Sequence, residues 1–373
     1  MAEPVLITDE ALESLRQRIG NERQPSEPPH IGVATKDAIR HFAWGIGDDN
    51  PLWTEKEYAK GTKWEGIIAP PCILYAMDCG ASGHIGGGLP GIHAMFSGTD
   101  WEWYLPIRVN DSITCTGQLS DVIEKSRSQF SRRMVLQGFE TVFHNQDGQL
   151  VSRAKFWALR TERGAAKEKG KYHGIAQHLY NPKQIESIEA DYDKEERRGR
   201  VPRYWENVEV GEELTPVVKG PLTITDIICF KIGWGGVPFV RAHHLALTWR
   251  RRHPGAVIAN RFGVPDIPER VHWEDEFARD VGAPAAYDYG PQRISWLGHL
   301  MTNWIGDDGF LKRLSVEVRR FNIIGDTTWC KGKVTRKYID NGEHLVECEI
   351  WAENQRGEIT APGKAIVSLP SKE

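Results

Sequence analysis

Apolar and polar residues alternate over several stretches in both halves of the chain, the pattern of half-buried strands. These stretches are Ser112–Leu119, Arg133–Phe143, Leu150–Leu159, Leu314–Phe321, Asp326–Tyr338, His344–Glu353 and Ile359–Leu369. Asn145–Gly148, Asn354–Gly357 and Asn341-Gly342 separate some of them, and such Asn/Gly pairs favour hairpin turns. The pattern predicts an antiparallel sheet in each half.

One longer helix is expected before the strands of each half. In the second half it covers Gly290–Ile305, where an apolar face repeats at helical spacing. That face comprises Ile294, Leu297, Leu300, Met301 and Trp304. The first-half helix starts at Pro71 and runs to about Met77, and the glycine-rich Gly80–Gly98 is expected to be a loop. A helix buried against a curved antiparallel sheet is an α+β arrangement.

Three segments recur in the same order at spacings of 209–219 residues, which predicts a duplicated domain. Leu52–Lys60 matches Val271–Arg279, Trp101–Gln118 matches Val316–Lys333, and Asn145–Leu159 matches Asn354–Leu369. The expected division is a first domain over 1–160, a charged linker or exposed helix over 161–205, and a second domain over 206–373.

Composition narrows the class of protein. The 373 residues carry a net charge of −4 and no long apolar or basic run, so neither a membrane span nor a nucleic-acid surface is expected. The N-terminus lacks the apolar core of a signal peptide, which favours a cytoplasmic protein. Six cysteines without CxxC spacing and thirteen scattered histidines give no sign of a metal or redox cofactor. Fourteen tryptophans suggest either a broad aromatic pocket or two large cores.

The segment Phe42–Trp53 contains Gly47-Asp48-Asp49-Asn50-Pro51-Leu52. It resembles the signature G-D-x-N-P-apolar-H of the MaoC-like hydratases and dehydratases, a family with the hotdog fold. Trp53 stands where that family has its histidine, and Ala69-Pro70-Pro71 stands where its hotdog helix begins with Ala-His-Gly. The resemblance therefore implies a double hotdog whose first half has a degenerate motif and holds the acyl tail.

The second half supplies the missing histidine, because His272 aligns with Trp53. Gly282–Gly290 resembles the family's entry into the hotdog helix, with Tyr289 in place of histidine. The family acid lies five residues before its histidine, and Ile267 occupies that position here. We expect Asp266 to be the acid, with Asp288 and Glu274 in reserve.

The resemblance implies hydration of a 2-enoyl-CoA thioester or the reverse dehydration. A carboxylate and an imidazole can share the proton transfers, and N–H groups at a helix start can stabilise the thioester oxygen. His272 and Asp266 are thus the predicted catalytic pair. Substrate contacts are predicted at the positions Tyr289, Gly290, Asp288, His243, Asp48 and Trp53. The alternative interpretations are a structural role for His272, a turn cap for Asp48 and core positions for the tyrosines.

Other functions of the same fold stay open at this stage. A thioesterase would release free thiol, and a non-catalytic acyl-CoA-binding protein would show no turnover. The thioester carrier could also be an acyl-carrier protein. Both carriers are anionic, and Arg250–Arg252 or Arg319-Arg320 could provide a basic patch. The tryptophans suggest a bulky acyl group. The fused pair already supplies a two-hotdog unit, and a homodimer of it is a further option.

Overall fold

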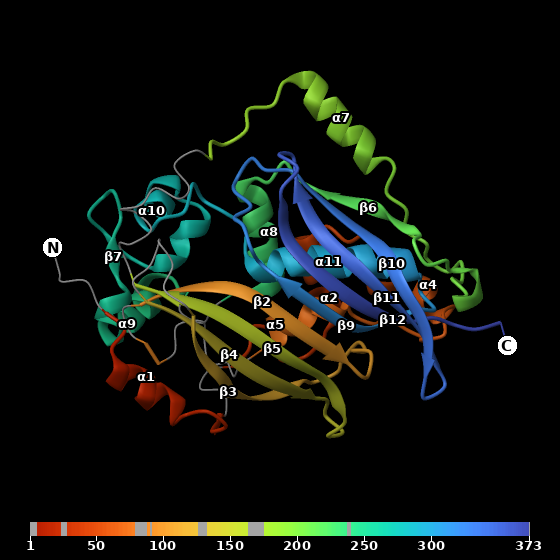
Figure 1. Ribbon diagram of the computed structural model, residues 1–373, viewed down its shortest axis with the longest axis horizontal. Coiled ribbons are helices and arrows are strands. Elements are labelled where there is room, and N and C mark those ends of the chain that lie inside the picture. Colours follow the sequence, from red (N-terminus) through yellow and green to blue (C-terminus); the bar gives the residue numbers. More distant parts are fainter. Residues whose placement is uncertain are drawn as a thin grey trace.

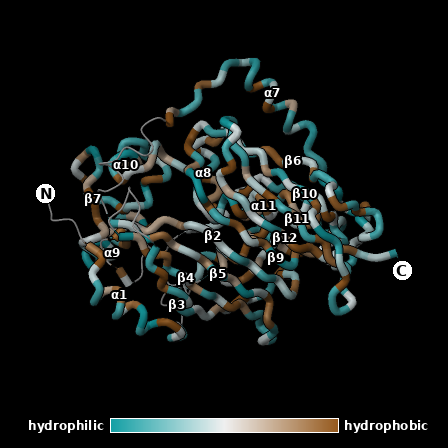
Figure 2. Tube along the Cα trace, viewed as in Figure 1, coloured by the Kyte–Doolittle hydropathy of each residue, from teal (hydrophilic) through white to brown (hydrophobic). Residues whose placement is uncertain are grey.

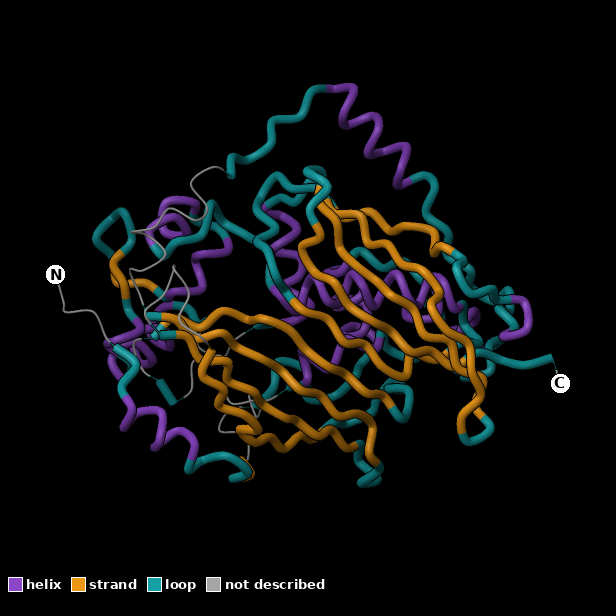
Figure 3. The backbone as a smooth tube through the Cα atoms, viewed as in Figure 1, coloured by secondary structure: helices purple, strands orange, loops and turns teal. Residues whose placement is uncertain are grey.

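Ten described strands form one antiparallel sheet in the computed structural model, which describes residues 6–23, 28–78, 88–89, 92–125, 133–162, 175–236 and 240–372. In sheet order they are β1 (Glu22–Arg23), β3 (Thr114–Lys125), β4 (Met134–His144), β5 (Leu150–Thr161), β2 (His93–Trp103), β9 (Phe310–Glu317), β12 (Ile359–Ser368), β11 (Glu343–Asn354), β10 (Thr328–Asp340) and β6 (Glu213–Lys219). Figure 3 shows them side by side in one twisted layer. Buried and more exposed positions alternate along β5, as the sequence predicts, and hydropathy alternates along the strands (Figure 2).

The two halves meet where β2 pairs with β9 (Figure 1). Asp100 lies opposite Ser315 and Trp101 opposite Leu314 in this register. Beside this seam, Arg313 Nε donates to Asp100 Oδ1 over 2.8 Å. The sheet is therefore continuous from one half into the other.

The longest described helix is α11, with 16 residues, and the other described helices have 11 residues or fewer. They are α1 (Asp9–Arg16), α2 (Lys36–Ile46), α3 (Pro51–Thr54), α4 (Lys56–Lys60), α5 (Leu74–Met77), α7 (Pro182–Tyr192), α8 (Ile224–Trp234), α9 (His243–Arg252), α10 (Asp275–Asp280) and α11 (Gly290–Ile305). Four 3-10 turns accompany them: η1 (Pro71–Ile73), η2 (Trp205–Asn207), η3 (Pro254–Ala256) and η4 (Pro268–His272). None of the described helices combines the length and apolar character needed to cross a bilayer.

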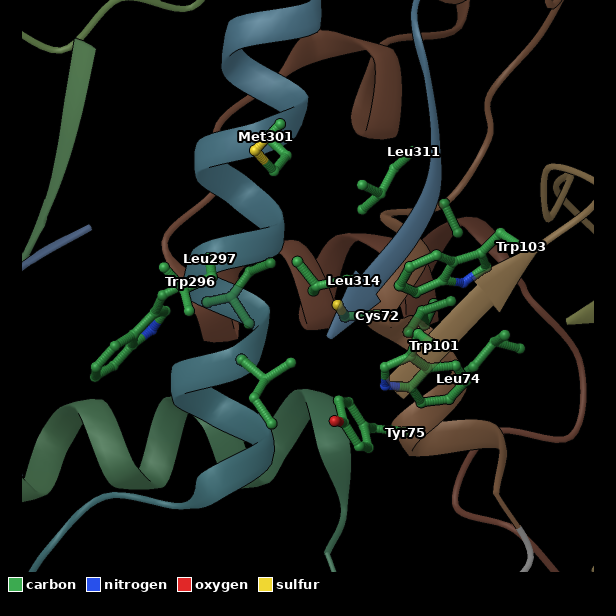
Figure 4. Close-up of a cluster of buried hydrophobic side chains, with 14 of the residues drawn as sticks. Cys72, Leu74, Tyr75, Trp101, Trp103, Trp296, Leu297, Met301, Leu311 and Leu314 are labelled. Atoms are coloured by element: carbon green, nitrogen blue, oxygen red, sulfur yellow. The ribbon is translucent and has the colours of Figure 1, made fainter. Parts of the chain in front are cut away.

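Helix α11 has the predicted bounds and is the centre of the molecule. It packs against β6, β9, β10, β11 and β12 of its own half and against α2, η1 and β2 of the other. In Figure 4 Trp296, Leu297 and Met301 lie on this helix, and Trp101 of β2 lies across the cluster, with Leu314 and Cys72 between them. Trp101 stacks on Trp103 with ring centroids 5.4 Å apart. These two tryptophans therefore fill the core, which is one of the two roles that the composition suggests.

Matching hydrogen bonds confirm the duplication. Asp111 Oδ2 accepts from Arg108 N over 2.7 Å, and Asp326 Oδ2 accepts from Ile323 N over 3.0 Å. The other carboxylate oxygen accepts from Gln146 in the first half and from Gln355 in the second. The hairpins at Asn145 and Asn354 are also alike, because each side-chain oxygen accepts two backbone N–H groups.

Some element bounds differ from the sequence prediction. The strand expected over Leu314–Phe321 is β9, which begins at Phe310 and ends at Glu317. Beyond it the N–H groups of Arg319 and Arg320 turn to Thr360 O, and the chain leaves the sheet. The predicted linker contains α7 beside β6. Of the glycine-rich loop, residues 80–87 and 90–91 lie outside the described residues, and 93–98 belong to β2. The division into two domains with a linker stays a prediction.

Candidate active site at the start of α11

His272 ends η4 and lies close to the first turn of α11. Its Nδ1 is 2.8 Å from Tyr287 O. Because a carbonyl oxygen only accepts, Nδ1 carries the proton and Nε2 keeps its lone pair. Burial lowers the pKa of His272, and the opposing effect of the Glu269 carboxylate is smaller. The imidazole is therefore held neutral, with Nε2 as a base.

Tyr289 packs directly on His272, with ring centroids 3.8 Å apart. The Tyr289 hydroxyl is buried beside the Glu269 carboxylate. Burial raises its pKa, and Glu269 raises it further. Lys231 Nζ of α8 lies 3.4 Å from Glu269 Oε1 and 5.6 Å from the Tyr289 ring. The cluster thus joins a neutral base, a buried phenol and a carboxylate near a lysine.

Glu269 is the carboxylate that the structure brings to His272. The two residues are three apart in η4, and a 3-10 helix has three residues per turn, so their side chains share one face. Glu269 is 7% exposed. The sequence prediction chose Asp266 over Glu269, because Asp266 lies next to the position five residues before the histidine at which the family motif has its acid.

Gly290 begins α11 immediately after Tyr289. Its N–H donates no hydrogen bond to any described residue and lies at the positive end of the helix dipole. A Cβ at this position would lie 2.4 Å from Phe96 Cδ1 of β2. Glycine is therefore needed because the first half packs closely against the start of α11.

The other acids predicted near His272 have different partners. Asp266 accepts from Asn260 Nδ2 over 3.2 Å and from Ile267 N over 2.8 Å, and no described interaction joins it to His272. Glu274 pairs with Arg270. Asp288 is buried in a pair with Arg293 and also accepts from Asn322. His243 is exposed at the start of α9 and makes no described contact with His272.

In the first half, Asp48 accepts from Asn50 N over 3.0 Å, as the turn-cap interpretation predicts. Trp53 is buried and lines a cavity of about 40 Å³ with Trp64 and Trp103. That space suits water-sized groups, so an acyl tail would enter only if these side chains moved. Pro70 caps the first-half helix and Pro71 is its first residue, so neither of these two positions has an N–H group to donate. This half lacks the helix-start donors that Gly290 offers in the second.

A second buried cluster joins the halves and was not predicted. His299 of α11 has its Nε2 3.7 Å from Asp48 Oδ1, and its Nδ1 lies 2.9 Å from Lys219 Nζ. Lys219 also donates to the carbonyls of Ile46 and Gly47 at the end of α2. Burial raises the pKa of Asp48 to about 6 and lowers that of His299 well below its ordinary value.

No three His, Cys, Asp or Glu side chains within the described ranges are grouped so that they could hold a metal ion. At the start of α11, His272 and its neighbours can transfer protons, and the helix terminus can stabilise developing negative charge.

Comparison with known proteins agrees with this architecture. Residues 27–154 match the family model described as FAS1-like, dehydratase domain region. A Streptomyces avermitilis protein named UPF0336 protein is 28% identical over 108 residues, which is 28% of this chain and 70% of that protein. A Thermobifida fusca protein of the same name is 28% identical over 112 residues, 29% of this chain and 71% of that protein.

Among solved structures, a MaoC-like dehydratase has a TM-score of 0.67 at 16% identity, covering 95% of this chain and 100% of that one. A Mycobacterium tuberculosis protein described as a double hotdog has a TM-score of 0.56 at 9% identity, covering 94% and 96% of the two chains. These likenesses show the fold. The chain has a double-hotdog fold: residues 27–154 match the FAS1-like dehydratase region, and the overall fold is similar to that of a MaoC-like dehydratase, as the motifs predict.

Proposed function

We propose that this protein is a hydro-lyase that adds water to a 2-enoyl-CoA thioester, or removes it from the 3-hydroxyacyl form. The observation that carries the proposal is the neutral His272 packed against Tyr289 beside Glu269, at a helix start whose Gly290 N–H has no described partner. The names of the similar proteins, dehydratases among them, support the same reaction class.

In the hydration direction, His272 Nε2 takes a proton from water as the water oxygen bonds to Cβ. The electrons of the double bond move toward the thioester oxygen, where the Gly290 N–H and the helix dipole stabilise the developing charge. The imidazolium then returns its proton to Cα, so the sum is one water added. Tyr289 and Glu269 orient the ring and the water.

The acid that assists His272 is Glu269 in this proposal, in place of the predicted Asp266. Glu269 is buried on the face of η4 that carries His272, whereas Asp266 is engaged by Asn260 and Ile267 N. The two carboxylates thus give the experiment a matched pair of variants only three residues apart.

The test is purified protein with short, long and cyclic 2-enoyl-CoAs, following loss of the enoyl absorbance and release of free thiol together. We expect absorbance loss without thiol. His272→Ala and Glu269→Gln should each lower kcat/KM by about a hundredfold or more, while Asp266→Asn keeps near-normal activity. Unfolding midpoints of the three variants would separate lost chemistry from lost folding.

Each other outcome selects a different conclusion. Thiol release would make the protein a thioesterase, and binding without turnover would make it an acyl-CoA-binding protein. Loss of activity in Asp266→Asn but not in Glu269→Gln would restore the assignment read from the sequence. Equal turnover of short and bulky substrates would rule out a preference for bulky acyl groups.

A further inference from the structure

The segment between α8 and η4 contains a long stretch with basic residues and no acidic ones. Residues 240–265, here called the basic insert, contain five arginines and no aspartate or glutamate, although the whole chain has a net charge of −4. The insert comprises α9, η3 and the two short paired strands β7 (Ile258–Ala259) and β8 (Pro265–Asp266). The last residue of β8, Asp266, lies just outside the insert. Figure 1 shows α9 and β7 at the end of the molecule where α10 lies.

The charge of the insert is not neutralised within the described structure. Arg251 and Arg252 are exposed and form no described ion pair or hydrogen bond. Arg319 and Arg320, the other basic pair, are bound to Glu317 at 2.8 Å and Glu358 at 3.0 Å. A helix C-terminus favours basic residues, but Arg241 and Arg261 lie outside α9, so the helix dipole does not account for the whole patch.

The insert also presents an aromatic ring to solvent on a fixed turn. Asn260 Oδ1 accepts from Phe262 N over 3.0 Å and from Val264 N over 3.2 Å. This turn leaves the Phe262 side chain 74% exposed, with the Arg261 guanidinium 4.8 Å from its ring. An exposed ring beside arginines is the combination that binds a nucleobase by stacking and its phosphates by charge.

The insert is tied to the segment that holds His272. Arg270, two residues before His272, donates to Ala259 O of β7 over 3.1 Å. Arg250 donates to Pro265 O of β8, just before η4. Hydrogen bonds from arginine side chains to backbone carbonyls therefore connect the basic insert to the proposed catalytic segment.

We propose that the basic insert binds the 3′-phosphorylated adenosine diphosphate of the CoA thioester, with Arg251 and Arg252 on the phosphates and Phe262 against the adenine. This inference rests on the proposed function for the choice of ligand. The nucleotide end carries several negative charges and a flat base, which complement the exposed arginines and the exposed ring.

The first experiment needs no turnover. Binding of 3′,5′-ADP to the full chain is measured by calorimetry for the wild type, for Arg251→Gln/Arg252→Gln and for Arg319→Gln/Arg320→Gln. Both double variants change the net charge equally, and glutamine keeps helix propensity. We expect affinity to fall about tenfold or more in the first variant and to stay within about twofold in the second. Phe262→Ala should weaken binding as well.

The proposal is overturned if the wild type does not bind the nucleotide, or if the two double variants weaken binding equally. It is also overturned if an acidic carrier protein or anionic vesicles, but not the nucleotide, bind in an arginine-dependent way. A second assay compares enoyl-CoA with the corresponding enoyl-pantetheine, which lacks the nucleotide. Arg251→Gln/Arg252→Gln should raise KM about tenfold for the first substrate only. Nucleotide binding without turnover of either thioester would contradict the proposed function while supporting the insert as a nucleotide site.

Discussion

Asp48, His299 and Lys219 are all buried, and burial disfavours the charged form of each. The pKa of the acid is raised and the pKa values of both bases are lowered. The cluster is therefore driven toward neutral, hydrogen-bonded groups. It stabilises the contact between the end of α2 in the first half and α11 in the second, because Lys219 binds the carbonyls of Ile46 and Gly47.

Asp48 should give the protein a specific dependence of stability on pH. Its pKa is about 6 in the folded chain against 3.8 ordinarily, so the folded state binds the proton more tightly. The contribution of protonated Asp48 to the stability of the folded chain is fully present below about pH 4 and is lost as the pH rises through about 6. As the pH rises from 4 to 7, the unfolding free energy of Asp48→Asn should therefore increase by about 3 kcal/mol relative to that of the wild type.

The measurement is chemical unfolding of both proteins across that pH range. Asparagine keeps the acceptor for Asn50 N, so the turn is preserved. Asp49→Asn is the matched control, because the Asp49 side chain is 85% exposed and pairs with Arg197. A difference between Asp48→Asn and wild type that stays constant with pH would show that burial does not control this carboxyl.

A site residue is easier to predict from the sequence when the residues that it contacts lie close to it along the chain. His272 follows from the repeat, because its counterpart position is fixed by local similarity. Glu269 requires knowing that Pro268–His272 forms a 3-10 turn, in which residues three apart share a face. The contact between His299 and Asp48 spans the two halves, and no local pattern encodes it. His299 is one of several polar residues of α11, so the residue type alone does not indicate this contact.

Helices α2 and α8 cross so closely that each contributes a glycine at the contact. A Cβ on Gly233 would lie 2.5 Å from His41 O, and one on Gly45 would lie 2.9 Å from Cys229 O. Both of these neighbours are backbone atoms, which cannot rotate away. The crossing places α8, and with it Lys231, beside the cluster around His272.

Gly233→Ala should therefore destabilise the protein by about 1–3 kcal/mol through overpacking, although alanine favours a helix interior. Gly255→Ala is the matched control, because nothing lies within 4 Å of its Cβ position. Both changes restrict the unfolded chain alike. Equal unfolding midpoints for the two variants would mean that the helices can separate at no cost.

The local sequence pattern predicts whether a segment is a helix or a strand, but it does not predict which other elements pack around it. The apolar face of Gly290–Ile305 predicts a helix with one buried side. The structure buries nearly every residue of α11, including Gln292, His299 and Asn303, because the sheet covers one side and elements of the first half cover another. Strand β9 starts earlier than predicted, because its pairing with β2 and β12 sets its bounds.

At the scale of the whole molecule, hydrogen bonds of both the backbone and the side chains join the two halves. Besides the β2–β9 pairing, Asp307 at the end of α11 accepts from Asn50 over 3.3 Å and from Tyr58 over 2.7 Å. Its carbonyl accepts from Trp64 Nε1 over 2.7 Å. Three first-half side chains thus converge on one second-half residue, so neither half retains its buried polar partners alone.

If the chain is cut between residues 162 and 175, the two fragments should therefore stay associated as one folded molecule. A protease site inserted between residues 168 and 169 allows the cut after folding, and the uncut protein with the same insertion is the control. We expect both fragments to elute together at the size of the 42.2 kDa chain and to unfold in one transition. Because the two halves share one sheet and their buried polar contacts, neither should unfold without the other. Separate elution, or two transitions at different denaturant concentrations, would show that the halves are independent domains and that the β2–β9 seam is weak.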